Sequence, residues 1–270
     1  MRTLLEPASM DMIVGGMASN PSGAASRQPV TTLHPLPTTH SEVNSRSWFA
    51  NFYRSALGKK YVMAITGIML FGFVFIHMVG NLKLYLGADA LNHYGEWLRE
   101  VGAPAFPNSA VLWIARIVLL IAVWLHIQAA TQLTLMNRRA RPVDYDKREA
   151  VIASYASRTM RWGGVIILIF IIYHILHLTT GKAHSDFIHG EPYHNVVVGF
   201  QNIWVSLVYI VANIALGFHL YHGLWSMFQS MGWNHPKFNS WRRVFAVTFA
   251  LLIAIVNVSY PVTVLLGLVD

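Results

Sequence analysis

Five long apolar stretches dominate the sequence and restrict the folds that it can adopt. They cover roughly residues 61–82, 110–136, 162–180, 202–228 and 244–268. A helix of about 20 residues, rising about 1.5 Å per residue, crosses the hydrocarbon core of a bilayer, which is about 30 Å thick. Inside lipid the backbone must satisfy its own hydrogen bonds, which a helix does within one segment. The pattern therefore predicts an all-α membrane protein with five transmembrane helices.

The composition favours lipid over water as the surroundings of these helices. Of the 270 residues, 54% are hydrophobic and 12% are charged, whereas soluble domains average about 25% charged residues. One such run is compatible with a buried helix of a soluble protein, but five with so few charges argue against it. The chain has no cysteine. Alone it therefore supplies neither a thiolate ligand for haem nor the ligands of an all-cysteine iron–sulfur cluster.

The first 45 residues differ in character from the rest. They are polar, rich in Ser, Thr, Pro and Asn, and contain no apolar core of the kind that a signal peptide needs. We expect residues 1–45 to be a disordered tail and residues 46–270 to form the membrane domain.

Lysine and arginine are distributed unevenly between the two sides of the predicted bundle. Fourteen lie between residue 46 and the first stretch, between the second and third stretches, or between the fourth and fifth. The other two connections hold three, at Lys83, Arg99 and Lys182. By the positive-inside rule the N-terminus is cytoplasmic and the C-terminus lies outside. Topology thus explains the net charge of +8, and nucleic acid is not an expected partner.

Six histidines fall inside the apolar stretches, where ionisable residues are costly and by default indicate function. They are His77, His126, His174, His177, His219 and His222. A single neutral histidine is more simply explained as an interhelical hydrogen-bonding group. At least one on each of four successive helices favours a cofactor.

The depth of the histidines along their helices predicts two layers. At about 1.5 Å per residue, His77 and His174 lie in the outer half of the membrane, and His126 and His219 lie in the inner half. Two facing histidines at each of two depths can ligate two haems in a four-helix bundle, so that the first four helices surround the cofactors. The cytochrome bc plan, with two histidines about four turns apart on one helix, does not fit.

Four stretches carry a resemblance to a known family. They are FIHMVGN (75–81), IAVWLHI (121–127), LIFIIYHI (168–175) and GFHLYHGLWS (217–226). The chain resembles the single-chain, five-helix, two-haem membrane anchor of succinate dehydrogenase and fumarate reductase, the cytochrome b558 type. The resemblance covers about residues 50–268, and the histidine followed by GLWS is its most specific part.

The resemblance implies a role in respiratory electron transport and, with succinate dehydrogenase, in the tricarboxylic acid cycle. Its four ligands carry over to His77, His126, His174 and His219, which bind haem b in the pairs His77–His174 and His126–His219. Such an anchor passes electrons from an iron–sulfur subunit, supplied by a flavoprotein, to a quinone, here expected to be menaquinone. The chain is then a subunit of an enzyme that lies in the bacterial cytoplasmic membrane, with a higher oligomer as one option. The succinate site lies in the partners.

Two histidines depart from the family pattern. His177 and His222 each follow a presumed ligand by one turn, on nearly the same face. Packing or contact with haem propionates is the favoured role for both. The sharper alternative is that they bind another centre, such as a histidine-ligated [2Fe–2S] cluster whose thiolates come from a partner chain. Arg116, early in the second stretch, either pairs with a propionate or snorkels to the interface.

Quinone reduction needs a proton donor near the membrane surface. The outer loop ALNHYGEWLREVG, 90–102, supplies Glu100 as the first candidate and Glu96 as the second, and an ordinary solvated loop is the alternative. Two other functions stay open. One is a cytochrome b anchor of a hydrogenase or formate dehydrogenase. The other is a haem-free bundle, structural or transporting, whose histidines carry protons.

Overall fold

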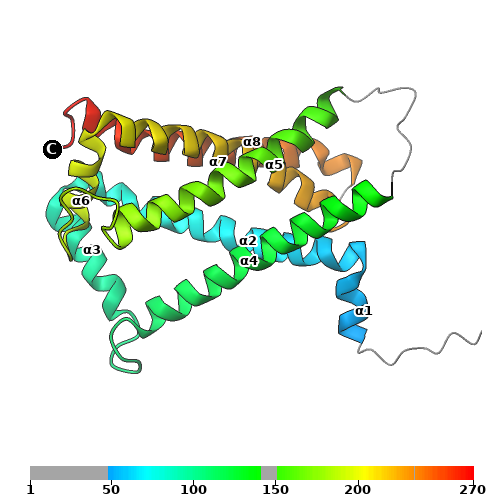
Figure 1. Ribbon diagram of the computed structural model, residues 1–270, viewed down its shortest axis with the longest axis horizontal. Coiled ribbons are helices and arrows are strands. Elements are labelled where there is room, and N and C mark those ends of the chain that lie inside the picture. The colour runs from blue at the N-terminus through cyan, green and yellow to red at the C-terminus, as the bar shows by residue number, and fades with distance from the viewer. Residues whose placement is uncertain (1–47, 141–150, 234) are drawn as a thin grey trace, which may run out of the picture. The chain divides into compact units, whose positions relative to one another are not determined.

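Within the part of the chain that the structure describes, the long helices are the five that the apolar stretches predict. The structure, a computed structural model, describes residues 48–140, 151–233 and 235–270. The helices long and apolar enough to cross a membrane are α2 (Ala56–Asn81), α4 (Ala110–Arg139), α5 (Val151–His174), α7 (Ile203–Ser230) and α8 (Asn239–Leu265). Every regular element in the described ranges is helical (Figure 1). The all-α membrane fold is confirmed; the expected tail, 1–45, lies outside the described residues.

Polar side chains set the ends of two of these helices. Ser55 begins α2, and its hydroxyl accepts a hydrogen bond from the Gly58 amide at 2.9 Å. Asn202 begins α7, and its Oδ1 accepts from the Trp204 amide at 3.0 Å. Both are preferred N-cap residues because they satisfy amides that have no partner within the helix. Lys59 instead stabilises the C-terminal end of a helix. It is buried, and its Nζ donates to the carbonyl of Arg54, the last residue of α1 (Trp48–Arg54).

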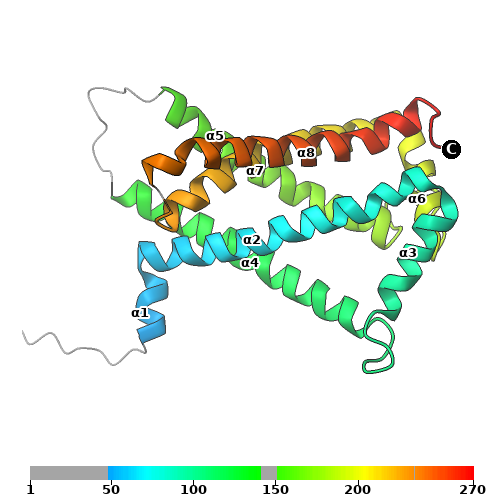
Figure 2. The same ribbon diagram turned by 180° about the vertical axis from the view of Figure 1, so that it is seen from behind.

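The spans pack in two pairs that are joined by α8. Helix α2 packs against α4, α5 packs against α7, and α8 packs against α7 and α2. Consecutive spans run in opposite directions (Figure 1, Figure 2). Most apolar side chains point away from these contacts: only 6% of the most apolar part of α4 is buried within the chain. That surface suits lipid, because water would leave it unfavourably hydrated.

Short helices close one end of the bundle. Helix α3 (Ala88–Glu100) occupies most of the segment that the sequence suggested was a loop, and α6 (Pro192–Gln201) precedes α7. Together with the C-terminus they lie at one end, called the α6 end, whereas α1 lies at the opposite end (Figure 1, Figure 2). Gly80 permits this closure: a Cβ there would lie 2.6 Å from the hydroxyl oxygen of Tyr94 in α3.

Two buried clusters hold the elements together. The larger lies at the α6 end and unites α3, α6, α7 and α8 through seven buried residues, Leu84, Leu91, Val197, Phe200, Tyr209, Tyr260 and Val264. The smaller joins α2, α7 and α8 through Met78, Leu220, Ala250 and Ile253. Tyr260 links the two clusters, because its hydroxyl donates to the Met78 carbonyl at 2.8 Å.

Candidate functional site

Four of the six membrane histidines meet in two pairs. The rings of His77 (α2) and His174 (α5) have centroids 5.8 Å apart and planes at 85°. The rings of His126 (α4) and His219 (α7) have centroids 6.4 Å apart and planes at 62°. We call them the outer pair and the inner pair, after the predicted topology. These are the combinations that the depth argument anticipated.

Each pair bridges two helices that do not pack closely on each other. Helix α2 lies along α4, and α5 lies along α7. In contrast, the backbones of α2 and α5, and those of α4 and α7, come close at very few points, if any, within the described residues. The imidazoles therefore reach across the seam between the two helix pairs. A flat group inserted along that seam would separate side chains rather than tightly packed backbones.

The outer pair is held by a phenol from another helix. The Nδ1 of His174 lies 3.2 Å from the hydroxyl oxygen of Tyr209 on α7. The Nδ1 of His177 lies 3.0 Å from the same oxygen. The ring of His77 stacks on Phe73, one turn earlier, with centroids 5.4 Å apart. Because Nδ1 of His174 is engaged, its Nε2 is the nitrogen left for a ligand.

The inner pair is held mainly by α2. The Nδ1 of His126 lies 3.2 Å from both the Thr66 hydroxyl oxygen and the Met63 carbonyl oxygen. The Nδ1 of His219 is buried and has no hydrogen-bond partner among the described residues. Glycines back both rings: a Cβ on Gly67 would lie 3.5 Å from Cε1 of His126, and one on Gly164 would lie 3.7 Å from Cε1 of His219.

The two additional histidines have different surroundings. His177 is 2% exposed and lies in a π-helical turn, η2 (Ile175–Thr179), that continues α5. Its ring stacks on His184, with centroids 4.8 Å apart, and on Tyr173, at 5.4 Å. His222 is half-buried, and its ring lies 4.9 Å from that of Tyr221. His177 thus belongs to the outer pair's surroundings.

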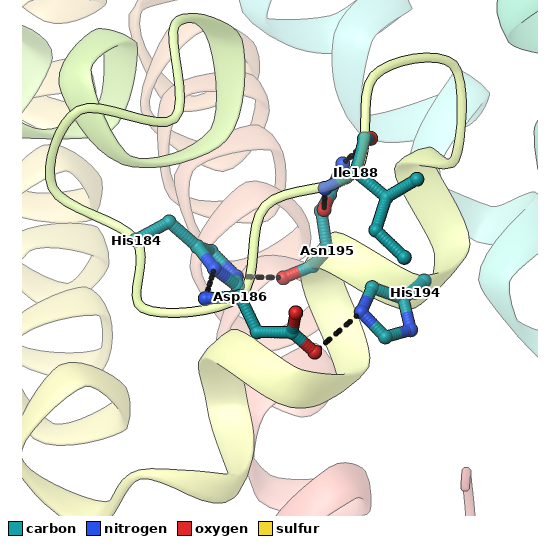
Figure 3. Close-up of polar contacts among 5 residues, drawn as sticks. All are labelled: His184, Asp186, Ile188, His194 and Asn195. Carbon is teal, nitrogen blue, oxygen red and sulfur yellow. Dashed lines mark hydrogen bonds and ion pairs between the residues drawn. The ribbon is translucent and has the colours of Figure 1, made fainter.

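A polar cluster at the α6 end fixes His184. Its Nε2 donates to the Asn195 carbonyl at 2.8 Å, and its Nδ1 accepts from the Asp186 amide at 3.0 Å (Figure 3). The Asn195 side chain bonds both the amide and the carbonyl of Ile188, each at 2.8 Å. Nε2 of His194 lies 3.0 Å from a carboxylate oxygen of Asp186. This cluster was not predicted from the sequence, although the density of histidines between 184 and 194 was a signal.

The candidate quinone residues lie on the surface of α3. Glu96 and Glu100 are one turn apart and exposed. Glu96 lies 4.0 Å from Nδ1 of His93. Within the described residues neither carboxylate forms a hydrogen bond or ion pair with the outer pair.

Arg116 places its guanidinium 4.9 Å from the centre of the Trp113 ring.

The pairs are two-ligand sites. In the described ranges, no three or more side chains of His, Cys, Asp or Glu converge as they would around a metal held by protein alone. Two imidazoles per site are the number that a bis-histidine haem requires, since its other four ligands come from the macrocycle.

Comparison with known proteins agrees with the resemblance. The model of the succinate dehydrogenase/fumarate reductase transmembrane subunit family matches residues 137–258. The match covers less than half of the chain and shows that this segment is similar to that family. No curated protein and no solved structure gave a significant match to the chain.

The family match covers four of the six membrane histidines. It includes α5, α7 and much of α8, and with them His174, His177, His219 and His222. His174 and His219 are the two ligand candidates in this segment. Their partners, His77 and His126, precede it. The structure adds the pairing, because it places His174 beside a histidine of α2 and His219 beside a histidine of α4.

Proposed function

We propose that the chain is the membrane-anchor subunit of a succinate:quinone oxidoreductase and that it carries electrons from an iron–sulfur subunit to a quinone. Two haems b, one at the outer pair and one at the inner pair, would serve as the electron carriers. The observation that carries this proposal is the presence of two facing imidazole pairs, with centroids 5.8 and 6.4 Å apart, in which one histidine of each pair lies in the family-matched segment.

The residues fit a haem at each pair. A bis-histidine haem would need two imidazoles that face each other from different helices, and each pair offers two such rings. The orphaned Nδ1 of buried His219 also indicates that the inner site lacks a group in the chain alone, because buried polar atoms are normally paired. Gly67 and Gly164 lie beside the same rings without a side chain, since a Cβ there would be in van der Waals contact with Cε1 of His126 or His219.

Haem supplies one-electron redox chemistry, and the residues supply its position and surroundings. His77, His126, His174 and His219 would hold the two haems, and His126 and His174 would bind through Nε2 because their Nδ1 atoms are engaged. The hydroxyls of Tyr209 and Thr66 fix the ring orientation of His174 and His126 from the Nδ1 side, as outer partners of metal-bound histidine commonly do. The surrounding apolar helices exclude water.

The remaining parts of the proposal concern partners and topology. The flavoprotein and iron–sulfur subunits dock at the α1 end, where basic residues such as Lys60, Arg138 and Arg139 lie, and this end faces the cytoplasm of a bacterium. Quinone, expected to be menaquinone, binds near the α6 end, where Glu100 or Glu96 exchanges protons. Arg116 neutralises a propionate of the outer haem.

The test is a haem and iron analysis of the purified complex. A pyridine haemochrome assay and a reduced-minus-oxidised spectrum are expected to give about two haems b per chain, together with a flavin subunit that oxidises succinate. A hydrogenase or formate dehydrogenase anchor would retain the haems without that subunit. Non-haem iron beyond that of the soluble subunits, without haem, would instead assign the histidines to an iron–sulfur centre. The absence of any cofactor would reduce the chain to a structural or proton-carrying bundle.

A further inference from the structure

The hydroxyl of Tyr209 lies between two histidines and sits in the larger buried cluster. Its oxygen lies 3.2 Å from Nδ1 of His174 and 3.0 Å from Nδ1 of His177. Tyr209 is 4% exposed and His177 is 2% exposed. Solvent therefore does not replace either contact, and the three groups have to satisfy one another.

The number of protons restricts how this can be done. A phenol has one O–H to donate, and the same oxygen can accept. One imidazole must therefore carry its proton on Nδ1 and donate to the oxygen of Tyr209, and the other must accept the Tyr209 proton at a bare Nδ1. Two orders are possible. In only one of them does His174 carry its proton on Nδ1 and present a bare Nε2.

We propose that Tyr209 is a positioning residue for the outer haem ligand and that His177 sets the direction of its hydroxyl. His174 donates from Nδ1 to Tyr209, and Tyr209 donates to Nδ1 of His177. This order leaves Nε2 of His174 free for iron. The opposite order would put a proton on that nitrogen and prevent ligation. The inference rests on the proposed function and gives His177 a role that is not ligation.

Neighbouring side chains keep Tyr209 and His177 in place. Tyr209 is enclosed edge-on by Phe170, with centroids 5.0 Å apart, and by Phe200, at 4.8 Å. His177 stacks between Tyr173 and His184, and His184 is fixed by the α6-end cluster in Figure 3. The orientation of His174 is thus set in part by residues outside the membrane-spanning helices.

The test is a redox titration of the intact complex carrying Tyr209→Phe, followed by haem absorbance. The phenol accepts from the ligand and makes His174 more basic, which stabilises oxidised iron. Without it, the equilibrium constant for reduction of the outer haem should rise about three- to tenfold, which is about 30–60 mV at 59 mV per tenfold for one electron. The inner haem should not change. Loss of His174 and loss of His219, in separate variants, identify which haem is which.

Two further positions separate positioning from packing. The ring of Tyr173 contacts those of His177 and Tyr209, but its hydroxyl bonds neither His174 nor His177. Tyr173→Phe should therefore leave the reduction potentials of both haems unchanged. His177→Asn keeps an acceptor near the Nδ1 position and should preserve the outer potential, whereas His177→Leu removes the acceptor and should shift it in the direction of Tyr209→Phe. A purely structural role would not distinguish asparagine from leucine by potential.

The outcomes distinguish this inference from the proposed function. Two haems in the original complex with an unchanged outer potential in Tyr209→Phe would overturn the positioning role alone. A shift confined to the inner haem would overturn it as well. An original complex without haem would overturn both proposals, since His174 would then not be a ligand. Should Tyr209→Phe fail to assemble, the His177→Asn and His177→Leu comparison decides the matter.

Discussion

The outer and inner histidine pairs have similar ring separations but are built in different ways. Around the outer pair, His174 is oriented by Tyr209, which lies 35 residues away on another helix. Around the inner pair, His126 meets the Thr66 hydroxyl and the Met63 carbonyl, which belong to one turn of α2. The outer pair thus depends on the assembly of several distant segments. The hydrogen bonds of the inner pair depend on one helix contact, between α2 and α4.

The two pairs also differ in what covers them. The cluster around Tyr209 includes Leu91 from α3 and Val197 and Phe200 from α6, so elements outside the spans reach the outer pair. Among the described residues, the contacts given above for the inner pair come from the membrane-spanning helices α2, α4, α5 and α7. We therefore expect changes at the α6 end to disturb the outer site while the inner site remains intact.

The largest expected effect is the selective loss of one haem. His174→Leu should remove the outer haem and His219→Leu the inner one, because each deletes a proposed haem ligand. The haem-to-protein ratio should fall to about half in either variant, with different potentials remaining. His93→Leu, on the exposed surface of α3, is the control and should keep both haems. Simultaneous loss of both haems in either variant would contradict the independence of the two sites.

A carboxylate on α3 should affect quinone turnover without affecting haem. Glu100→Gln is expected to slow succinate:quinone reductase activity about 100-fold, since general acid–base groups contribute about 10²–10⁴, while both haems remain reducible by succinate. Glu96→Gln tests the second candidate, and Asp89→Asn in the first turn of the same helix is the control. Unchanged turnover in both glutamate variants would move the quinone site away from the α6 end.

A methyl group on α6 should destabilise the outer region. The Cβ of Gly199→Ala would lie 2.7 Å from Cε1 of His177 and 3.2 Å from Nε2 of His184. Both rings are stacked and hydrogen-bonded, so the overpacking should cost about 1–3 kcal/mol. Thermal unfolding in detergent measures this loss. Gly223→Ala, where a Cβ meets nothing within 4 Å, should not lower stability; an equal loss in both variants would refute the clash.

The smallest expected effect lies at the inner pair. Thr66→Val removes the hydroxyl that lies 3.2 Å from Nδ1 of His126, but the Met63 carbonyl remains at the same distance. The equilibrium constant for reduction of the inner haem should rise by no more than about threefold. Thr134→Val, which deletes a similar hydroxyl bonded only to its own helix, is the control for the redox titration. If Thr66→Val shifted the inner haem potential more than Tyr209→Phe shifts the outer one, the inner pair would depend more strongly on its side-chain partner than the outer pair does.

Much of the membrane architecture follows from the sequence because lipid imposes a strong, one-dimensional constraint. Apolar length alone locates the five spans, and depth along them separates His77 and His174 from His126 and His219. The short helices α3 and α6 do not follow in this way. Their packing depends on contacts such as Tyr94 against Gly80, which join separate elements.

The hydrogen-bond partners of the histidines likewise could not be predicted from the sequence. Tyr209 is one of several aromatic residues in an apolar run, and nothing in its spacing singles it out. Two histidines three residues apart, His174 and His177, could have suggested a shared partner on a facing helix. They could not have identified the helix or the residue, because that depends on the rotation of α7 in the bundle.

The π-helical turn that ends α5 makes the outer site sensitive to chain length. The Thr180 amide donates to the Ile175 carbonyl five residues earlier, at 2.9 Å, so this turn holds one residue more than an α-helical turn. Deleting a single residue between His174 and Thr180 would restore an α-helix and rotate the following chain by about 100°. An insertion or deletion in this segment would therefore break the contact between His177 and Tyr209 even with both side chains retained.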